Sequence, residues 1–205
     1  MSYFLIFLST LFIATRKDVM YENITGVSTL PEYHLLVVVY TIVCAFYFAY
    51  QTYRHFQYLN YYPKYIPYLI VFTTFIMCIG AICPYSNDQS WLSQLHVYAS
   101  MISSLFFIVI LQIYTHYLSI QYPSIYIQTH WIFHCGLQVL IILFIVSGHV
   151  SGILEILYVF FICLYLFLID QYRIKGESLQ WFTFKNNNVI IHNQRYVIPI
   201  CLDYF

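Results

Sequence analysis

The chain has 205 residues, of which 61% are hydrophobic, 21% aromatic and only 8% charged, whereas an ordinary soluble domain has about 25% charged residues. A chain this apolar has too few polar side chains to cover a water-facing surface, which predicts a membrane protein. Eight acidic and eight basic residues cancel to a net charge of zero. No basic patch stands out, so we expect no nucleic acid partner.

The first apolar run ends before Arg16 and Lys17 and is shorter than the about 20 residues that a membrane-spanning helix needs. The basic residues follow this run instead of preceding it, and no small-residue cleavage pattern is present. Both features favour a short or tilted first span over a secretory signal. A signal-like segment stays open as the alternative.

Later apolar runs predict five further membrane spans, separated by polar or proline-containing links. They are His34–Tyr53, Ile66–Cys83, Ser90–Tyr114, Ile125–Val146 and Ile153–Ile169. The predicted fold class is therefore an all-α integral membrane helical bundle of five to six transmembrane helices, occupying residues 1–172.

The basic residues are distributed unequally between the two predicted sides of this bundle. Six lie on one side, namely Arg54, Lys64, Arg173, Lys175, Lys185 and Arg195, and only Arg16 and Lys17 lie on the other. The side richer in Lys and Arg faces the cytoplasm. We therefore expect a multi-pass protein with both termini cytoplasmic and with the loops Thr15–Tyr33, Pro84–Gln89 and Ser147–Gly152 outside.

Residues 173–205 differ in character from the predicted spans. Two strand-like runs, Leu179–Phe184 and Val189–Ile200, flank the turn-like segment Lys185–Asn188. This pattern predicts a small cytoplasmic tail with a β-hairpin. The six cysteines of the whole chain form no C-x-x-C pair and lie mostly in apolar runs, which indicates core side chains.

Ionisable side chains inside or near spans are the candidate site residues, because such groups are costly in hydrocarbon. His96 and Glu155 both lie near the outer ends of predicted spans, and we expect them to meet there. Glu32, Asp88 and His149 share their depth and complete a predicted outer polar cluster. The alternative is that the His96–Glu155 pair is only an interhelical hydrogen bond, worth about 1 kcal/mol.

His130 and His134 are spaced four residues apart, so they share one face of a helix. This spacing can place two ring nitrogens on one zinc ion. Two histidines are an incomplete ligand set, and His96 is predicted to lie about 9 Å away in depth at the helical rise of about 1.5 Å per residue. We therefore expect no cofactor, with a zinc or haem site as the alternative.

Three short segments together resemble the DRAM/Frag/Sfk-like multipass membrane family and its bacterial relatives. They are Ile24–Gly26 with Pro31–Glu32, His96–Ala99 after Pro84, and Leu154–Ile156. The resemblance implies a six-helix bundle with an outward-facing polar site. It also implies a role in lipid handling, GPI-anchor remodelling or autophagy. We expect membrane lipids as partners, with a membrane protein or a second copy of the chain as the alternative partner.

A second resemblance, to alkaline-ceramidase-like intramembrane hydrolases, rests on Asp18, Glu22, Glu32 and the pair His130 and His134. It implies a zinc-dependent hydrolase, but the central part of that family's pattern is missing here. No complete set of nucleophile, base and orienting group can be assembled from the sequence. We therefore favour a lipid-linked or interaction-type role and keep the metal-dependent hydrolase as the alternative.

Overall fold

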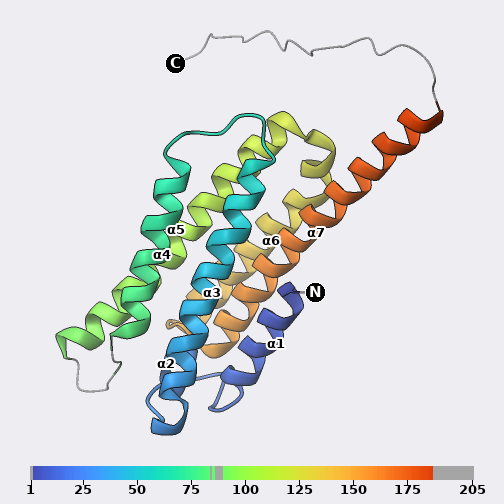
Figure 1. The fold of residues 1–205 in the computed structure, drawn as a ribbon. Helices are drawn as coiled ribbons and strands as arrows, with labels where there is room; N and C mark the ends of the chain where they lie inside the picture. The colour runs from blue at the N-terminus through green and yellow to red at the C-terminus, as the bar shows by residue number, and fades with distance from the viewer. Residues whose placement is uncertain (1, 84, 86–89, 187–205) are drawn as a thin grey trace.

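The computed structural model describes residues 2–83, residue 85 and residues 90–186. Within these ranges the regular structure is entirely helical (Figure 1). The helices are α1 (Ser2–Ala14), α2 (Ile24–Val27), α3 (Pro31–Gln57), α4 (Ile66–Ile82), α5 (Trp91–Gln121), α6 (Pro123–Ser147) and α7 (Gly152–Asn186).

Among the described residues, four helices are long and apolar enough to cross a membrane: α3, α5, α6 and the Gly152–Ile174 part of α7. The helices α1 and α4 are apolar but shorter, with 13 and 17 residues. Large apolar side chains such as Leu35, Phe75 and Ile145 point outward and are 63–72% exposed. An extensive exposed apolar surface is expected where lipid is the solvent. The structure is therefore compatible with an integral membrane protein.

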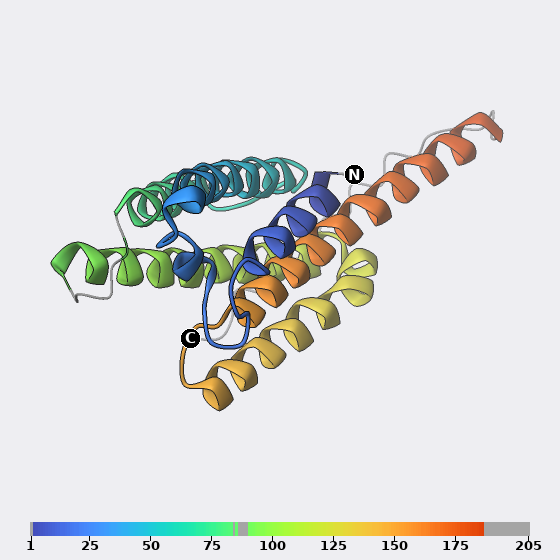
Figure 2. The same ribbon diagram turned by 90° about the horizontal axis from the view of Figure 1, so that it is seen from below.

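Helices that follow one another in the chain also lie side by side in the bundle. Seen from below, α3 and α4 lie on one side of α5 and α6 lies on the other, and α7 runs between α6 and α1 (Figure 2). The first helix packs against the last, and the single turn of α2 connects α1 to α3 at one end of the bundle (Figure 1). We call this end the α2 end.

Helix ends follow the local rules for proline and glycine. The helices α3, α4 and α6 each carry proline in their first turn, where the missing N–H costs no hydrogen bond. At its other end α6 stops at Gly148, whose φ of 69° lies in the left-handed region that glycine adopts without strain. These signals make the interhelical links short and hold neighbouring helices together.

The apolar runs predicted as spans form helices, four of which are long enough to cross a membrane, but the predicted strand at Leu179–Phe184 is wrong. The helix α7 continues without a break to Asn186, across the expected boundary at residue 173. Lone Gly176 costs a helix only about 1 kcal/mol, and extending an existing helix needs no new nucleus. The other predicted strand, Val189–Ile200, lies outside the described residues.

Candidate functional site at the polar end of an apolar cavity

An internal cavity of about 190 Å³ lies between α3, α4, α5 and α7. This volume exceeds the about 150 Å³ of an apolar cavity that admits benzene. Most of its wall is apolar and includes Val37, Ala45, Phe48, Ile70 and Met77. Serine and threonine hydroxyls also occur along it, several of them bonded to backbone carbonyls, whereas the histidine and glutamate side chains of its lining lie at the α2 end, where α2 covers the cavity. A cavity of this kind suits a ligand with one polar and one apolar end.

The polar end is built on α2, which the sequence forms through an asparagine cap. The Asn23 side chain accepts a hydrogen bond from the Gly26 N–H at 2.7 Å, as N-cap residues do. The Ile24 N–H at the start of this turn donates to Glu155 Oε2 at 2.6 Å. The Thr25 hydroxyl lies 3.1 Å from His96 Nε2. We call Ile24, Thr25, His96 and Glu155 the Thr25 site.

His96 is held from both sides of its ring. Its Nδ1 lies 2.9 Å from the carbonyl oxygen of Cys83, at the end of α4. A carbonyl only accepts hydrogen bonds, so Nδ1 carries the hydrogen in the neutral ring and Nε2 presents a lone pair. The Thr25 hydroxyl therefore donates to Nε2. The His96 side chain is buried, and it also contacts the Tyr85 ring, at 5.8 Å between centroids.

Glu155 lies in the first turn of α7, where a carboxylate is favoured by the helix dipole. The loop that precedes α2 is fastened to the same turn, because Gly152 N–H donates to Glu22 O at 2.8 Å and Ile153 N–H donates to Val19 O at 3.0 Å. A Cβ on Gly152 would lie 2.8 Å from Glu22 O. Glycine is thus required here for the loop to approach the helix, and this approach places α2 over the cavity.

The structure brings only part of the predicted outer polar cluster together. His96 and Glu155 both line the cavity, but no hydrogen bond joins them; each binds one of two adjacent residues of α2 instead. Glu32 is exposed in the first turn of α3 and does not line the cavity. His149 is exposed and contacts Ser147 O at 2.8 Å. Asp88 lies outside the described residues.

Sequence reasoning gave Thr25 no chemical role and missed His34. His34 lines the cavity from α3, and its Nδ1 lies 3.1 Å from Ser28 O, which follows α2. A hydroxyl in a predicted loop carries no signal by itself, and its pairing with a histidine 71 residues away needs the fold.

The alternative zinc pair, His130 and His134, lies on α6 away from the cavity. The two rings are 6.2 Å apart between centroids, and His130 stacks on Tyr126 at 4.6 Å. The Nδ1 of His130 also lies 2.9 Å from Tyr126 O. In the described part of the chain, no three His, Cys, Asp or Glu side chains are grouped as metal ligands. Zinc binding by this pair stays a prediction.

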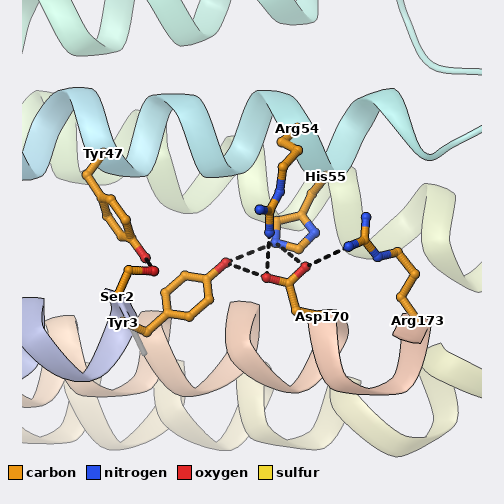
Figure 3. Close-up of polar contacts among 7 residues, drawn as sticks. All are labelled: Ser2, Tyr3, Tyr47, Arg54, His55, Asp170 and Arg173. Atoms are coloured by element: carbon orange, nitrogen blue, oxygen red, sulfur yellow. Dashed lines mark hydrogen bonds and ion pairs between the residues drawn. The ribbon is translucent and has the colours of Figure 1, made fainter. Parts of the chain in front are cut away.

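A second polar group lies at the opposite end of the bundle and was not predicted. Asp170 of α7 accepts hydrogen bonds from Tyr3 of α1 at 3.0 Å and from Arg54 of α3 at 2.5 Å (Figure 3). Its other oxygen lies 3.6 Å from Arg173 and 4.0 Å from His55. We call these five residues the Asp170 cluster. It joins three helices.

One signal could have revealed the Asp170 cluster. Arg54 and His55 end one predicted span, Asp170 follows another, and the predicted topology places all three on the same side. A carboxylate and a guanidinium at one depth in apolar surroundings are expected to pair. The Arg173 guanidinium completes the arrangement by lying over the Tyr58 ring, 3.6 Å from its centroid.

Comparison with known proteins adds no relative: no protein-family model, no curated protein and no solved structure matches this chain.

Proposed function

We propose that this protein is a multi-pass membrane protein that binds a membrane lipid, with one acyl chain in the cavity and the polar linkage of the lipid at the Thr25 site. The observation that carries this proposal is the cavity itself, whose surface is mostly apolar and whose histidine and carboxylate side chains, His34, His96 and Glu155, all lie at the α2 end. Hydrogen-bonding side chains at one end fix the orientation of a ligand, and the apolar wall provides most of the contact area.

The length of the cavity fits an acyl chain that occupies one leaflet. Beyond His34 at the polar end, the α3 residues that line it extend from Val37 to Ala49, which corresponds to about 18 Å at about 1.5 Å per helical residue. The hydrocarbon core of a bilayer is about 30 Å thick, so one leaflet provides about 15 Å. A chain extending from the Thr25 site along α3 would therefore fill the cavity to its deep end.

The resemblance to the DRAM/Frag/Sfk-like family supports the same proposal. The three segments on which it rests contain Thr25, His96 and Glu155, which are far apart in the chain and meet at one end of the cavity. Chance similarity among short segments gives no reason for them to meet. We infer a role in lipid handling from this coincidence.

We further propose six membrane crossings, with α1 and α4 as the short ones and with both termini in the cytoplasm. The excess of Lys and Arg on one side supports this orientation. The hydrogen bond between Tyr3 and Asp170 supports an even number of crossings, because it holds the start of α1 beside the later part of α7. The Thr25 site then faces the outer side.

Labelling of single cysteines tests this topology. In a variant without the six native cysteines, Asn23→Cys should react with a membrane-impermeant maleimide in intact cells. Asn187→Cys should react only after the membrane is permeabilised. Labelling of Asn187→Cys in intact cells would overturn the orientation.

A bulky substitution inside the cavity tests lipid binding. Ala45→Phe places a ring in the space proposed for the acyl chain, so we expect lipid co-purified in mild detergent to fall at least several-fold per protein, measured by mass spectrometry. The matched control is Val43→Phe, which adds a ring on the same helix at a position that is 52% exposed and outside the cavity. Equal lipid content in the two variants would refute the proposal.

A further inference from the structure

We propose that Thr25 is a nucleophile and His96 its general base, and that together they transfer an acyl group from an ester of the bound lipid to water. This inference rests on the proposed lipid site and adds a chemical activity to it. Three observations carry it: the direction of the Thr25–His96 hydrogen bond, the unusual partner of the Thr25 hydroxyl, and the position of both residues on the cavity.

The direction of the hydrogen bond is that of a nucleophile and its base. The Cys83 carbonyl holds the hydrogen of His96 on Nδ1, so the lone pair of Nε2 faces the Thr25 hydroxyl at 3.1 Å. A general base must lie within about 2.6–3.2 Å of the group whose proton it removes. The Cys83 carbonyl orients the ring, as the third member of such an arrangement does.

The Thr25 hydroxyl has a different kind of partner from the hydroxyls of threonines in the long helices. Those hydroxyls donate to the backbone carbonyl four residues earlier, as is usual for threonine within a helix. This holds for Thr10, Thr41, Thr73, Thr74, Thr115 and Thr129. Thr52 is the exception, with no hydrogen-bond partner within the described residues, and Thr10 and Thr115 also contact a tyrosine hydroxyl of another helix. Thr25 differs from all of these because its hydroxyl contacts a histidine ring nitrogen. A single-turn helix makes this possible because no residue four positions earlier belongs to it.

Thr25 and His96 are also placed where the ester of a bound lipid would lie. Both line the cavity at its α2 end. An acyl chain that fills the apolar part brings its carbonyl carbon to this end. Glu155 acts as a positioning residue, because it holds the Ile24 N–H and so fixes the backbone next to Thr25.

The reaction proceeds in two balanced steps. In the first, Thr25 Oγ1 forms a bond to the ester carbonyl carbon while its proton passes to His96 Nε2. The ester C–O bond then breaks, and the departing alkoxide takes that proton to leave as an alcohol. In the second step, water attacks the acyl-threonine ester while His96 Nε2 removes its proton, the bond between the acyl carbon and Thr25 Oγ1 breaks, and His96 returns the proton to Thr25 Oγ1. The products are a free fatty acid, the lipid alcohol and the original Thr25 hydroxyl.

An alkyl fluorophosphonate, which reacts with activated hydroxyl nucleophiles, tests the proposal on the intact chain. Peptide mass spectrometry should find the phosphonate on Thr25 of the unsubstituted protein. It should also find it at position 25 of Thr25→Ser, which keeps a hydroxyl there. Thr25→Val should not be labelled. His96→Gln should be labelled about 10²–10⁴-fold more slowly, the usual contribution of a general base. The control Thr129→Val removes a buried hydroxyl outside the cavity and should react normally.

Lipid content measured on the same samples separates this proposal from the lipid site. Protein that carries lipid but is not labelled on Thr25 would overturn the acyl-transfer proposal and leave lipid binding intact. Labelling at Thr25 of protein whose lipid content does not respond to Ala45→Phe would instead count against the lipid site. Unchanged labelling of His96→Gln would overturn the role of His96.

Discussion

The two ends of the bundle hold polar groups in very different ways. In the Asp170 cluster, the carboxylate is surrounded by Tyr3, Arg54, His55 and Arg173, so the charged groups of the cluster pair with one another. At the Thr25 site, few polar groups face a cavity of about 190 Å³. Both arrangements tolerate polar atoms in apolar surroundings, but only the second leaves room for a ligand. The adjoining cavity, rather than polarity or buried charge, therefore distinguishes the Thr25 site from the Asp170 cluster, whose role is structural.

The largest expected effect comes from disrupting the Asp170 cluster. Asp170→Ala leaves Arg54 and Arg173 without their carboxylate, and losing one partner of a buried ion pair costs about 3–5 kcal/mol. We expect the free energy of unfolding in detergent to fall by about that amount. Lipid bound per folded molecule should not change, because the cluster does not line the cavity.

A compensating variant sharpens this result. Replacing Asp170 and Arg54 together by leucine removes both charges and should restore part of the lost stability, as apolar replacement of buried pairs often does. If Asp170→Ala instead reduced lipid content and left stability unchanged, the cluster would belong to the functional site.

A glycine substitution at the α2 end tests whether the loop before α2 supports the Thr25 site. Gly152→Ala places a methyl group 2.8 Å from Glu22 O, so the loop before α2 must move. We expect a loss of about 1–3 kcal/mol, typical of overpacking, together with several-fold less co-purified lipid. Thermal unfolding and lipid mass spectrometry measure the two effects.

The matched control is Gly148→Ala. A Cβ added at Gly148 would contact no atom within 4 Å, but the φ of this residue is 69°. Left-handed backbone costs an alanine about 1–2 kcal/mol. Its stability should therefore fall similarly while its lipid content stays constant. Equal lipid loss in both variants would mean that Gly152 has no specific link to the site.

A double-mutant cycle tests the coupling within the Thr25 site. His96→Phe and Glu155→Gln remove groups that bind adjacent residues of α2 but do not bind each other. Coupling through Ile24 and Thr25 should be about 0.5–1 kcal/mol, at the low end for residues of one network. Thermal stability of the four proteins in detergent gives this energy. Additive effects within error would show that α2 does not connect the two residues.

The smallest expected effect concerns His130. Its ring packs on Tyr126 beside the half-buried His134, so His130→Ala should change the free energy of unfolding by about 0.5 kcal/mol or less, as is usual away from special sites. We also expect metal analysis to find less than one zinc per chain, because two histidines are an incomplete set. One zinc per chain in the unsubstituted protein that is lost in His130→Ala would instead support the metal-dependent hydrolase alternative.

The helices were predictable because long apolar runs bounded by polar residues determine them. The strand expected at Leu179–Phe184 failed because alternating aromatic residues occur in helices as well, and only the uninterrupted continuation of α7 decides between the two. His96 and Glu155 were predictable as costly groups at one depth. Their connection through α2 was not, because it depends on how the loop before α2 folds onto α7.

The bond between Tyr3 and Asp170 has a consequence for the order in which the protein is made. Its partners are 167 residues apart, and synthesis proceeds at about 5–20 residues per second. The first helix therefore waits about 10–30 s for the residue that holds it in place. During this interval its Tyr3 hydroxyl can pair only with His55 of α3, which lies 3.4 Å away in the folded bundle, or with water or lipid headgroups. Assembly of α1 into the bundle is thus a late event, completed only after the last membrane helix has left the ribosome.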